Sequence, residues 1–211
     1  MSSVAGDLYD FLFADEQHAG LLIADVSGHG VPAALIASMV KMAATSQRAQ
    51  ASHPAAMLTG MNSALCGNTQ GQYVTAAYVY LDADKRELQY SAAGHPAMLR
   101  LRNGAVTEIA ENGMLLAAVE GARYESTTLP LQSGDRLLLY TDGLLEARNA
   151  GGKLFGEESL AAELKTSAGM TPAETVNHLI GAVQRWARSQ DDDLTVIVCD
   201  FVGAPMLAPA D

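Results

Sequence analysis

Cysteine and long apolar runs are both scarce in this chain of 211 residues. Its two cysteines, Cys66 and Cys199, lie far apart and outside any Cys-x-x-Cys or Cys/His spacing, so we expect two buried, reduced thiols and no disulfide framework. No apolar run reaches the roughly 18 residues that a membrane span needs, and the N-terminus lacks the basic and apolar regions of a secretory leader. We therefore expect a cytoplasmic protein without a membrane partner.

Positive charge is also scarce. The chain has 13 Lys and Arg residues against 24 Asp and Glu residues, which gives a formal net charge of −11. Because nucleic acids are bound mainly through Lys and Arg, we expect no nucleic-acid partner. The apolar fraction of 49% and the length suffice for one domain with a substantial core, and nothing indicates a second domain.

Aspartate, by contrast, recurs at four separated places, each at the end of an apolar run or in a glycine-marked turn. Hard divalent cations prefer carboxylate, carbonyl and water oxygens, and a two-metal site needs several carboxylates from distant parts of a chain. The pattern predicts an oxygen-ligated metal centre if these places converge. They are Gly6-Asp7-Leu8-Tyr9-Asp10, Asp25-Val26-Ser27-Gly28-His29-Gly30, Thr141-Asp142-Gly143 and Asp191-Asp192-Asp193.

The first third of the chain predicts a strand, a glycine-rich turn and two helices. Residues 19–24 are almost wholly apolar, as expected of a strand buried on both faces. A helix begins at Val31, and its apolar face includes Leu35 and Ile36. A second helix begins near Pro54.

The middle of the chain predicts strands joined by turns. Asn103-Gly104 between two alternating runs is the strongest short-range signal of a β-hairpin. Two further strands flank the turn at residues 132–135, and the second of them leads to Asp142.

The last third predicts two helices and a final strand over residues 194–201. The second helix begins with the capping-box pattern Thr171-x-x-Glu174. Because strands come in runs and helices come as an early and a late pair, we expect an α+β fold of layered, mainly antiparallel sheets.

Five motifs then occur in an order that is typical of one family. They are GDLYDF, ADVSGHGVPAALIASM, AAGHPAMLRLRNG, LLLYTDGLLEARN and DDDLTVIVCDF, and they cover roughly Val4 to Phe201. Together they resemble the metal-dependent protein phosphatases (PPM, the type-2C serine/threonine phosphatases), in the branch of the bacterial stage II sporulation protein E. The resemblance implies two antiparallel β-sheets sandwiched between helix pairs, with two Mn²⁺ or Mg²⁺ ions at one edge. It also implies a phosphatase domain over residues 1–202 and a flexible tail over residues 203–211.

The resemblance carries metal-binding roles over to three residues in the middle of these motifs. Asp25 resembles the carboxylate that bridges both metals, and Val26 resembles the residue whose backbone carbonyl reaches one of them. Asp142 matches the aspartate of the Thr-Asp-Gly turn.

The two ends of the chain supply the other metal ligands that the resemblance implies. Asp7 matches an aspartate that binds a metal directly or through water, whereas Asp10 is either a ligand or an acceptor of backbone hydrogen bonds. In the late triplet, Asp192 is the first choice of ligand, Asp193 the second and Asp191 the third.

Other polar residues of the motifs have local explanations. His29 either takes part in the reaction, by protonating the leaving group, or shapes its loop through a hydrogen bond, while we expect His95 to be structural. Ser27 does not fit the Gly-x-Ser-x-Gly pattern of a nucleophile. Gly28 and Gly30 match neither phosphate-loop pattern and are expected to give the backbone room next to the metals.

The leading hypothesis is a phosphoprotein phosphatase that hydrolyses phosphoserine or phosphothreonine with a water activated by two metal ions. Asp25, Asp142 and Asp192 are the residues expected to be essential, with His29 as a further candidate. No covalent phosphoenzyme is expected, because a Cys-x₅-Arg motif is absent. A regulatory module that binds metal poorly and a small-molecule metallo-phosphoesterase are the alternatives.

Partners follow from the family resemblance. The expected substrate is a phosphorylated anti-sigma-factor antagonist of a bacterial partner-switching pathway, and a receiver or sensor domain usually precedes such a domain. A homodimer is compatible with the resemblance. Only six residues precede Asp7, where the family usually has a helix and a strand, so these first elements of the fold are expected to be lacking.

Overall fold

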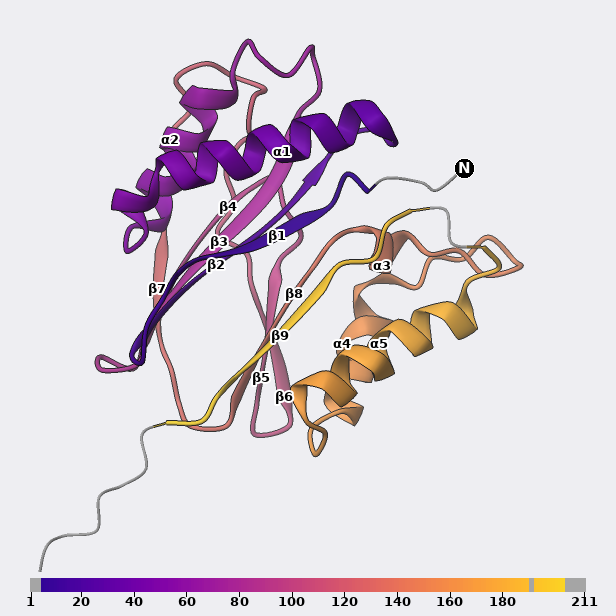
Figure 1. The fold of residues 1–211 in the computed structure, drawn as a ribbon. Helices are drawn as coiled ribbons and strands as arrows, with labels where there is room; N and C mark the ends of the chain where they lie inside the picture. The colour runs from indigo at the N-terminus through magenta and orange to yellow at the C-terminus, as the bar shows by residue number, and fades with distance from the viewer. Residues whose placement is uncertain (1–4, 190–191, 204–211) are drawn as a thin grey trace, which may run out of the picture.

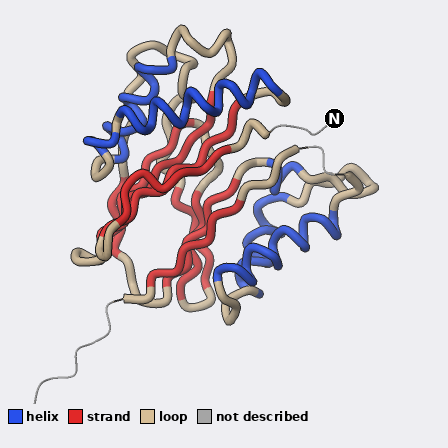
Figure 2. The backbone as a smooth tube through the Cα atoms, in the orientation of Figure 1, coloured by secondary structure: helices blue, strands red, loops and turns tan. Residues whose placement is uncertain are grey.

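Two antiparallel β-sheets pack face to face, and helices cover the outer face of each sheet (Figures 1 and 2). The computed structural model describes residues 5–189 and 192–203. The α+β fold predicted from the sequence is confirmed. The predicted tail lies outside the described residues, apart from Gly203.

The first sheet has five strands in the order β1-β2-β3-β4-β7, and α1 and α2 pack on its outer face (Figure 1). A short 3₁₀ helix, Arg48–Gln50, connects these two helices. The strands are β1 (Leu8–Ala14), β2 (His18–Val26), β3 (Val74–Asp82), β4 (Glu87–Ala93) and β7 (Thr127–Pro130), and the helices are α1 (Val31–Ser46) and α2 (Pro54–Leu65).

The second sheet has four strands in the order β6-β5-β8-β9, and α4 and α5 pack on its outer face. A single helical turn, α3, follows β8. The strands are β5 (Met98–Arg102), β6 (Ala105–Ile109), β8 (Asp135–Tyr140) and β9 (Val196–Phe201), and the helices are α3 (Gly143–Glu146), α4 (Gly156–Thr166) and α5 (Pro172–Trp186).

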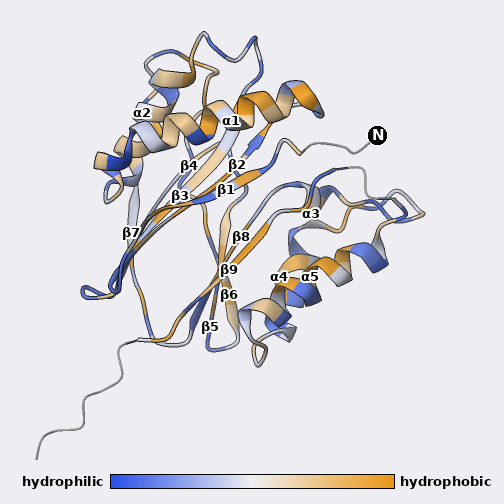
Figure 3. Ribbon diagram, in the orientation of Figure 1, coloured by the Kyte–Doolittle hydropathy of each residue, from blue (hydrophilic) through white to orange (hydrophobic). Residues whose placement is uncertain are grey.

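An apolar core lies between the sheets. Ile23 and Val79 of the first sheet belong to the same buried cluster as Leu137 and Leu139 of the second. Figure 3 shows apolar residues along β9 and α1, two elements that lie in different layers. Burial of side chains of this size contributes about 1.5–3 kcal/mol each, so the inner faces hold the two sheets together.

Two turn and cap predictions are confirmed in detail. Asn103 and Gly104 have φ angles of 51° and 76°, the left-handed pair that a type I′ hairpin requires, and they join β5 to β6. At the start of α5, the Thr171 hydroxyl accepts a hydrogen bond from the Glu174 amide, and the Glu174 carboxylate accepts one from the Thr171 amide. Local signals therefore specify local structure correctly.

The turn at residues 132–135 leads from one sheet to the other, because β7 pairs with β4 whereas β8 pairs with β5 and β9. The buried carboxylate of Asp135 accepts hydrogen bonds from the Arg102 side chain and from the Gln132 amide. Arg102 also donates to the Pro130 carbonyl, 2.8 Å away. The ion pair between Arg102 and Asp135 thus holds in place the turn through which the chain passes from the first sheet to the second.

A second buried cation ties the late helices to their sheet. The Arg136 guanidinium on β8 pairs with Asp200 on β9 and donates to the Ser167 and Met170 carbonyls and to the Thr175 hydroxyl. These acceptors lie in the loop between α4 and α5 and in the first turn of α5. The helix layer on the second sheet is therefore held by charge as well as by apolar contact.

Two sequence expectations need correction. Leu35 was expected on the apolar face of α1, but 63% of its surface is exposed, while Ile36 and Val40 are buried. Both cysteines are free, as expected, but each is only half-buried.

Within the described part of the chain, β1 and β7 are the edge strands of the first sheet, and β6 and β9 are those of the second. Tyr9 and Phe11 on β1 pair with Ile23 and Leu21 on β2 and so share their face of the sheet. They remain 57% and 55% exposed, because the second sheet does not extend over them.

No helix among the described residues is long and apolar enough to cross a membrane.

Candidate functional site

Four aspartate segments meet at one end of the sandwich. Leu8 pairs with Ala24, so Asp7, one residue earlier, lies opposite Asp25 at the end of β2. On the second sheet, Tyr140 pairs with Val196, and therefore the end of β8 and the start of β9 lie side by side. The antiparallel pairing thus brings the carboxylates of distant segments to a common edge, as the sequence predicted for Asp7, Asp25, Asp142 and Asp192.

Hydrogen bonds between the two sheets hold this edge in place. The Thr141 hydroxyl donates to the Asp7 carboxylate over 2.7 Å and accepts from the Thr195 amide over 3.2 Å. The Asp193 carboxylate accepts from the Gly6 amide over 3.0 Å. Asp7 is therefore positioned by residues that follow β8 and precede β9, although 134 residues separate it from Thr141.

Negative charge accumulates at this edge. Burial, together with the nearby carboxylates of Asp7 and Asp142, raises the pKa of Asp25 from its ordinary value of 3.8 to about 7. Burial also raises the pKa of Asp7, against the lowering effect of its hydrogen bonds with Thr195, Thr141 and Asp25. The charges that most strongly shift the pKa of Asp25 are those of Asp7, Asp142 and Asp192, and all three are negative.

Asp142 follows the same trend. Burial is the main reason why its pKa is raised, and the charges of Asp192, Glu146 and Asp7 add to the effect. Its side chain makes no cap for α3, which begins at the next residue. The carboxylate is therefore not occupied as a helix cap.

Glycine allows the two segments of the second sheet to touch. A Cβ atom at Gly143 would lie 2.1 Å from the Asp193 carbonyl oxygen, far inside any real contact. At Gly6, a Cβ would lie 3.0 Å from the Val26 carbonyl oxygen. Backbones therefore approach closely on both sides of the carboxylates, and the carbonyl of Val26, the predicted ligand, faces Gly6.

The donor set fits hard divalent cations. It consists of carboxylate oxygens with one backbone carbonyl, and its uncompensated negative charge would be relieved by Mn²⁺ or Mg²⁺. No three His, Cys, Asp and Glu side chains in residues 5–189 and 192–203 form a complete ligand set, however. Mg²⁺ usually retains several waters and needs only one or two direct carboxylates, so a site of this kind does not require three side chains around one ion.

The remaining acidic candidates lie apart from this cluster or outside the described residues. Asp10 forms an ion pair with Lys41 of α1, with 3.4 Å between Oδ2 and Nζ, and accepts the Phe11 amide. The second of its two expected roles, the acceptor of a backbone hydrogen bond, matches these contacts. Asp191 lies outside the described residues, so its ranking stays a prediction.

The two histidines of the motifs differ strongly. His29 is exposed in the turn before α1, and its ring makes no hydrogen bond to the described residues. His95 is buried, and its Nδ1 lies 2.9 Å from the Thr75 hydroxyl. Burial lowers the pKa of His95 to about 3. Its Nε2 lies near the Tyr140 backbone without a well-formed hydrogen bond, so His95 is a neutral residue between the sheets.

The turn after Asp25 is built from local hydrogen bonds. The Ser27 hydroxyl accepts from the Tyr73 amide over 3.1 Å, which agrees with the structural role expected of it. Gly28 and Gly30 have φ angles of 92° and 78°. A Cβ at Gly30 would meet nothing within 4 Å, so its backbone conformation, and not lack of room, favours glycine there.

Two residues of this edge were not singled out from the sequence. Thr141 and Thr195 join Asp7 to the second sheet, and each lies inside a motif, Thr141 directly before Asp142 and Thr195 two residues after Asp193. Threonine is common at strand ends, so its position in the sequence does not reveal which residue its hydroxyl binds. That residue is identified only by the way the two sheets stack.

Comparison with known proteins supports this arrangement. A sequence model described as stage II sporulation protein E (SpoIIE) matches residues 15–202 of the chain. The chain belongs to the SpoIIE family. This SpoIIE-family chain is 30% identical over 154 residues to the phosphoserine phosphatase RsbU of Bacillus subtilis, covering 72% of the chain and 46% of RsbU. It therefore spans less than half the length of that relative.

Solved structures share the fold of this SpoIIE-family chain. The SiaA-PP2C domain of Pseudomonas aeruginosa aligns with a TM-score of 0.84 at 24% identity, covering 93% of this chain and 81% of that one. The catalytic domain of the serine/threonine phosphatase PstP, solved with two manganese ions, aligns with a TM-score of 0.67 at 20% identity, covering 95% and 93%. At these identities the likeness establishes the fold.

Proposed function

We propose that this chain is a metal-dependent serine/threonine phosphoprotein phosphatase. The observation that carries the proposal is the convergence of Asp7, Asp25, Asp142 and Asp192, where burial and the neighbouring carboxylates together raise the pKa of Asp25 to about 7. Membership of the SpoIIE family supports the proposal, as does the name of RsbU as a phosphoserine phosphatase.

The proposed site uses these carboxylates as ligands of two Mn²⁺ or Mg²⁺ ions. Asp25, Asp142 and Asp192 would hold the ions, with Asp193 as the alternative in the late segment. When bound, such ions lower the pKa of a water and neutralise phosphate oxygens. Asp25 must give up its proton to serve as a ligand, which its pKa of about 7 allows at neutral pH.

Neighbouring residues would position these ligands. The hydroxyl of Thr141 holds Oδ2 of Asp7 in place, next to the Asp25 carboxylate with which it would share a cation. The Val26 carbonyl would add a further oxygen. The exposed His29, at the start of α1, is our candidate for protonating the serine or threonine oxygen as it leaves.

The substrate and setting are inferred by analogy with RsbU. We infer a phosphorylated anti-sigma-factor antagonist as substrate, a cytoplasmic location, and residues 1–202 as the phosphatase domain. A receiver or sensor domain would precede it in a longer protein, and a homodimer remains a possible assembly.

The test is Mn²⁺-dependent hydrolysis of p-nitrophenyl phosphate and of a phosphoserine peptide. We expect Asp25→Asn and Asp142→Asn each to reduce kcat at least 100-fold, because each removes a charge that holds a cation. Asp84→Asn, an exposed aspartate between β3 and β4, is the matched control and should keep the wild-type rate. Equal rates in all four proteins would contradict the proposal.

The same assay separates the two alternatives. A metal-poor regulatory module would turn over neither substrate, and calorimetric titration would detect fewer than two Mn²⁺ sites. A small-molecule metallo-phosphoesterase would hydrolyse nucleotide monophosphates faster than phosphopeptides. Preference for the phosphopeptide with two Mn²⁺ sites is the result we expect.

A further inference from the structure

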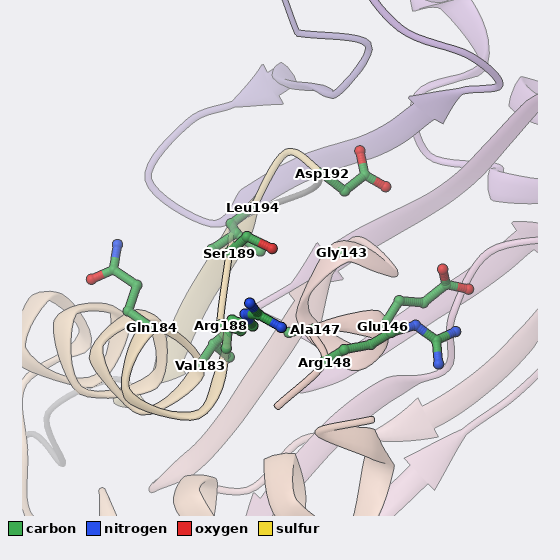
Figure 4. A pocket seen from close by; sticks show the side chains of 11 residues that line it. Gly143, Glu146, Ala147, Arg148, Val183, Gln184, Arg188, Ser189, Asp192 and Leu194 are labelled. Atoms are coloured by element: carbon green, nitrogen blue, oxygen red, sulfur yellow. The ribbon is translucent and has the colours of Figure 1, made fainter. Parts of the chain in front are cut away.

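A pocket of about 370 Å³ opens directly beside the aspartate cluster. Two residues that line it, Gly143 and Asp192, belong to the segments of that cluster, and the others come from α3, from α5 and from the chain that follows each helix. Figure 4 shows Arg188 and Ser189 on one wall and Glu146 and Arg148 on another. A molecule bound at the cluster would therefore extend into this pocket.

The pocket concentrates positive charge in an acidic protein. Arg148 and Arg188 both line it and both are exposed, and neither takes part in an ion pair with the described residues. Arg102 and Arg136, by contrast, are each bound to an aspartate. The Arg148 guanidinium donates to the Gly152 carbonyl over 3.3 Å, but no carboxylate of the described residues neutralises either arginine. In a chain with a net charge of −11, two guanidinium groups without a carboxylate partner at one pocket favour an anionic guest.

The backbone fixes the two arginines relative to each other. The Arg188 amide donates to the Arg148 carbonyl over 2.9 Å, which joins the segment after α5 to the segment after α3. The acidic residues of the pocket are Glu146 and Asp192. If Asp192 binds a cation, as proposed above, the cation neutralises its charge. The pocket is then lined by two guanidinium groups and by one remaining carboxylate, that of Glu146.

Resting on the proposed function, we propose that this pocket binds the part of a phosphoprotein that adjoins its phosphoserine. Arg148 and Arg188 would select an acidic side chain, Asp or Glu, close to the phosphorylated residue. Gln184 and Ser189 supply neutral hydrogen-bonding groups on the same walls. Because both arginines are exposed, each contributes a modest preference, about threefold, as expected of one exposed charge pair.

The experiment compares two phosphoserine peptides that differ only in their flanking residues. One carries Asp and Glu on both sides of the phosphoserine, and the other carries Asn and Gln there. We expect the wild type to hydrolyse the acidic peptide with a kcat/KM several-fold higher. Arg148→Ala and Arg188→Ala should each reduce that ratio about threefold, and the double substitution to Glu should invert it.

The ratio of the two peptides is the readout, because any effect of a substitution on the shared chemistry cancels in it. Arg185→Ala is the matched control, since Arg185 is an exposed arginine in the last turn of α5 that does not line the pocket. Thermal unfolding of each variant verifies its fold. Raising the salt concentration should shrink the preference of the wild type, because salt screens exposed charges.

The outcomes separate this inference from the proposed function. Equal turnover of both peptides by an active wild type would overturn the pocket assignment, as would an unchanged ratio in the double variant. If the protein hydrolyses neither peptide, fluorescence polarisation of the labelled pair still tests the pocket. Tighter binding of the acidic peptide without hydrolysis would support the pocket assignment and contradict the phosphatase function. Equal binding of both peptides without hydrolysis would contradict both proposals.

Discussion

Ionisation of the Asp25 carboxyl destabilises the folded state. Burial and neighbouring carboxylates raise its pKa from 3.8 to about 7. The unfolded chain releases this proton near pH 4, whereas the folded protein keeps it until about pH 7. Without metal, the contribution of Asp25 to the free energy of unfolding therefore falls as the pH rises through this window, and the full cost remains above it.

Asp25→Asn tests this prediction in metal-free buffer that contains a chelator. The neutral amide escapes the repulsion, so we expect the variant to be more stable than the wild type at pH 8, by about 1–2 kcal/mol because solvent screens a partly exposed group. The advantage should shrink as the pH falls toward 4. Urea unfolding measures it, and Asp84→Asn should show no such gain. A wild type that is more stable than Asp25→Asn at pH 8 would argue against repulsion within the cluster.

At the scale of elements, contact between α3 and the segment before β9 depends on one glycine. The Asp193 carbonyl oxygen occupies the space where any side chain at residue 143 would begin. The distance between Asp142 and Asp192 is therefore set by direct backbone contact and not by adjustable side chains.

Gly143→Ala should separate these two segments. We expect a loss of about 2 kcal/mol or more in the free energy of unfolding, because the clash is with backbone. We also expect at least about a tenfold loss of Mn²⁺ affinity, since the support of the ligands is displaced. Urea unfolding and calorimetry measure the two effects. Gly169→Ala, where a Cβ would meet nothing within 4 Å, is the control, and equal behaviour of both variants would disprove the close approach.

At the scale of the whole molecule, the proposed ligands come from both sheets. Asp7 and Asp25 belong to segments next to the first sheet, and Asp142 and Asp192 to segments next to the second. A cation shared by these residues would link the two layers beyond what the apolar core provides. Binding to the folded state alone would stabilise it by about 2.7 kcal/mol at a metal concentration of 100 times Kd.

Hydrogen exchange with and without Mn²⁺ tests this link between the sheets. We expect slower exchange at residues 6–8 and 24–26 of the first sheet together with residues 141–145 of the second. The β3–β4 turn, which lies at the opposite end of β3 from Asp25, should change little. Protection confined to one sheet would contradict a centre shared by both, and Asp142→Asn should abolish the coupled response.

Much of the fold was predictable because its signals are local. The hairpin at Asn103-Gly104 and the capping box at Thr171 depend on residues a few positions apart, and both are confirmed. The link between Thr141 and Asp7 was not predictable in this way, because it depends on how one sheet stacks on the other. The exposure of Leu35 likewise depends on the tilt of α1 against its sheet, which periodicity does not specify.

The candidate site was predicted as a set of carboxylates, and the family resemblance supplied the roles of its members. Strand pairing places Asp7 opposite Asp25 in the first sheet and brings the segments of Asp142 and Asp192 together in the second. The meeting of these two pairs depends on how one sheet stacks on the other. The pocket beside them was not foreseen. Arg148 and Arg188 are 40 residues apart, and only the backbone hydrogen bond between their segments brings them together.

His95 is a buried, uncharged residue close to the strand end that carries Asp25. It lies beside Thr75, the β3 partner of Asp25, and with a pKa of about 3 it carries no positive charge near neutrality. A cation that binds at these carboxylates, as proposed above, would compete with the proton on Asp25 for the same oxygens. Loading of the site would then be an ion exchange, and its occupancy would follow the ratio of free metal to proton activity and not the metal concentration alone.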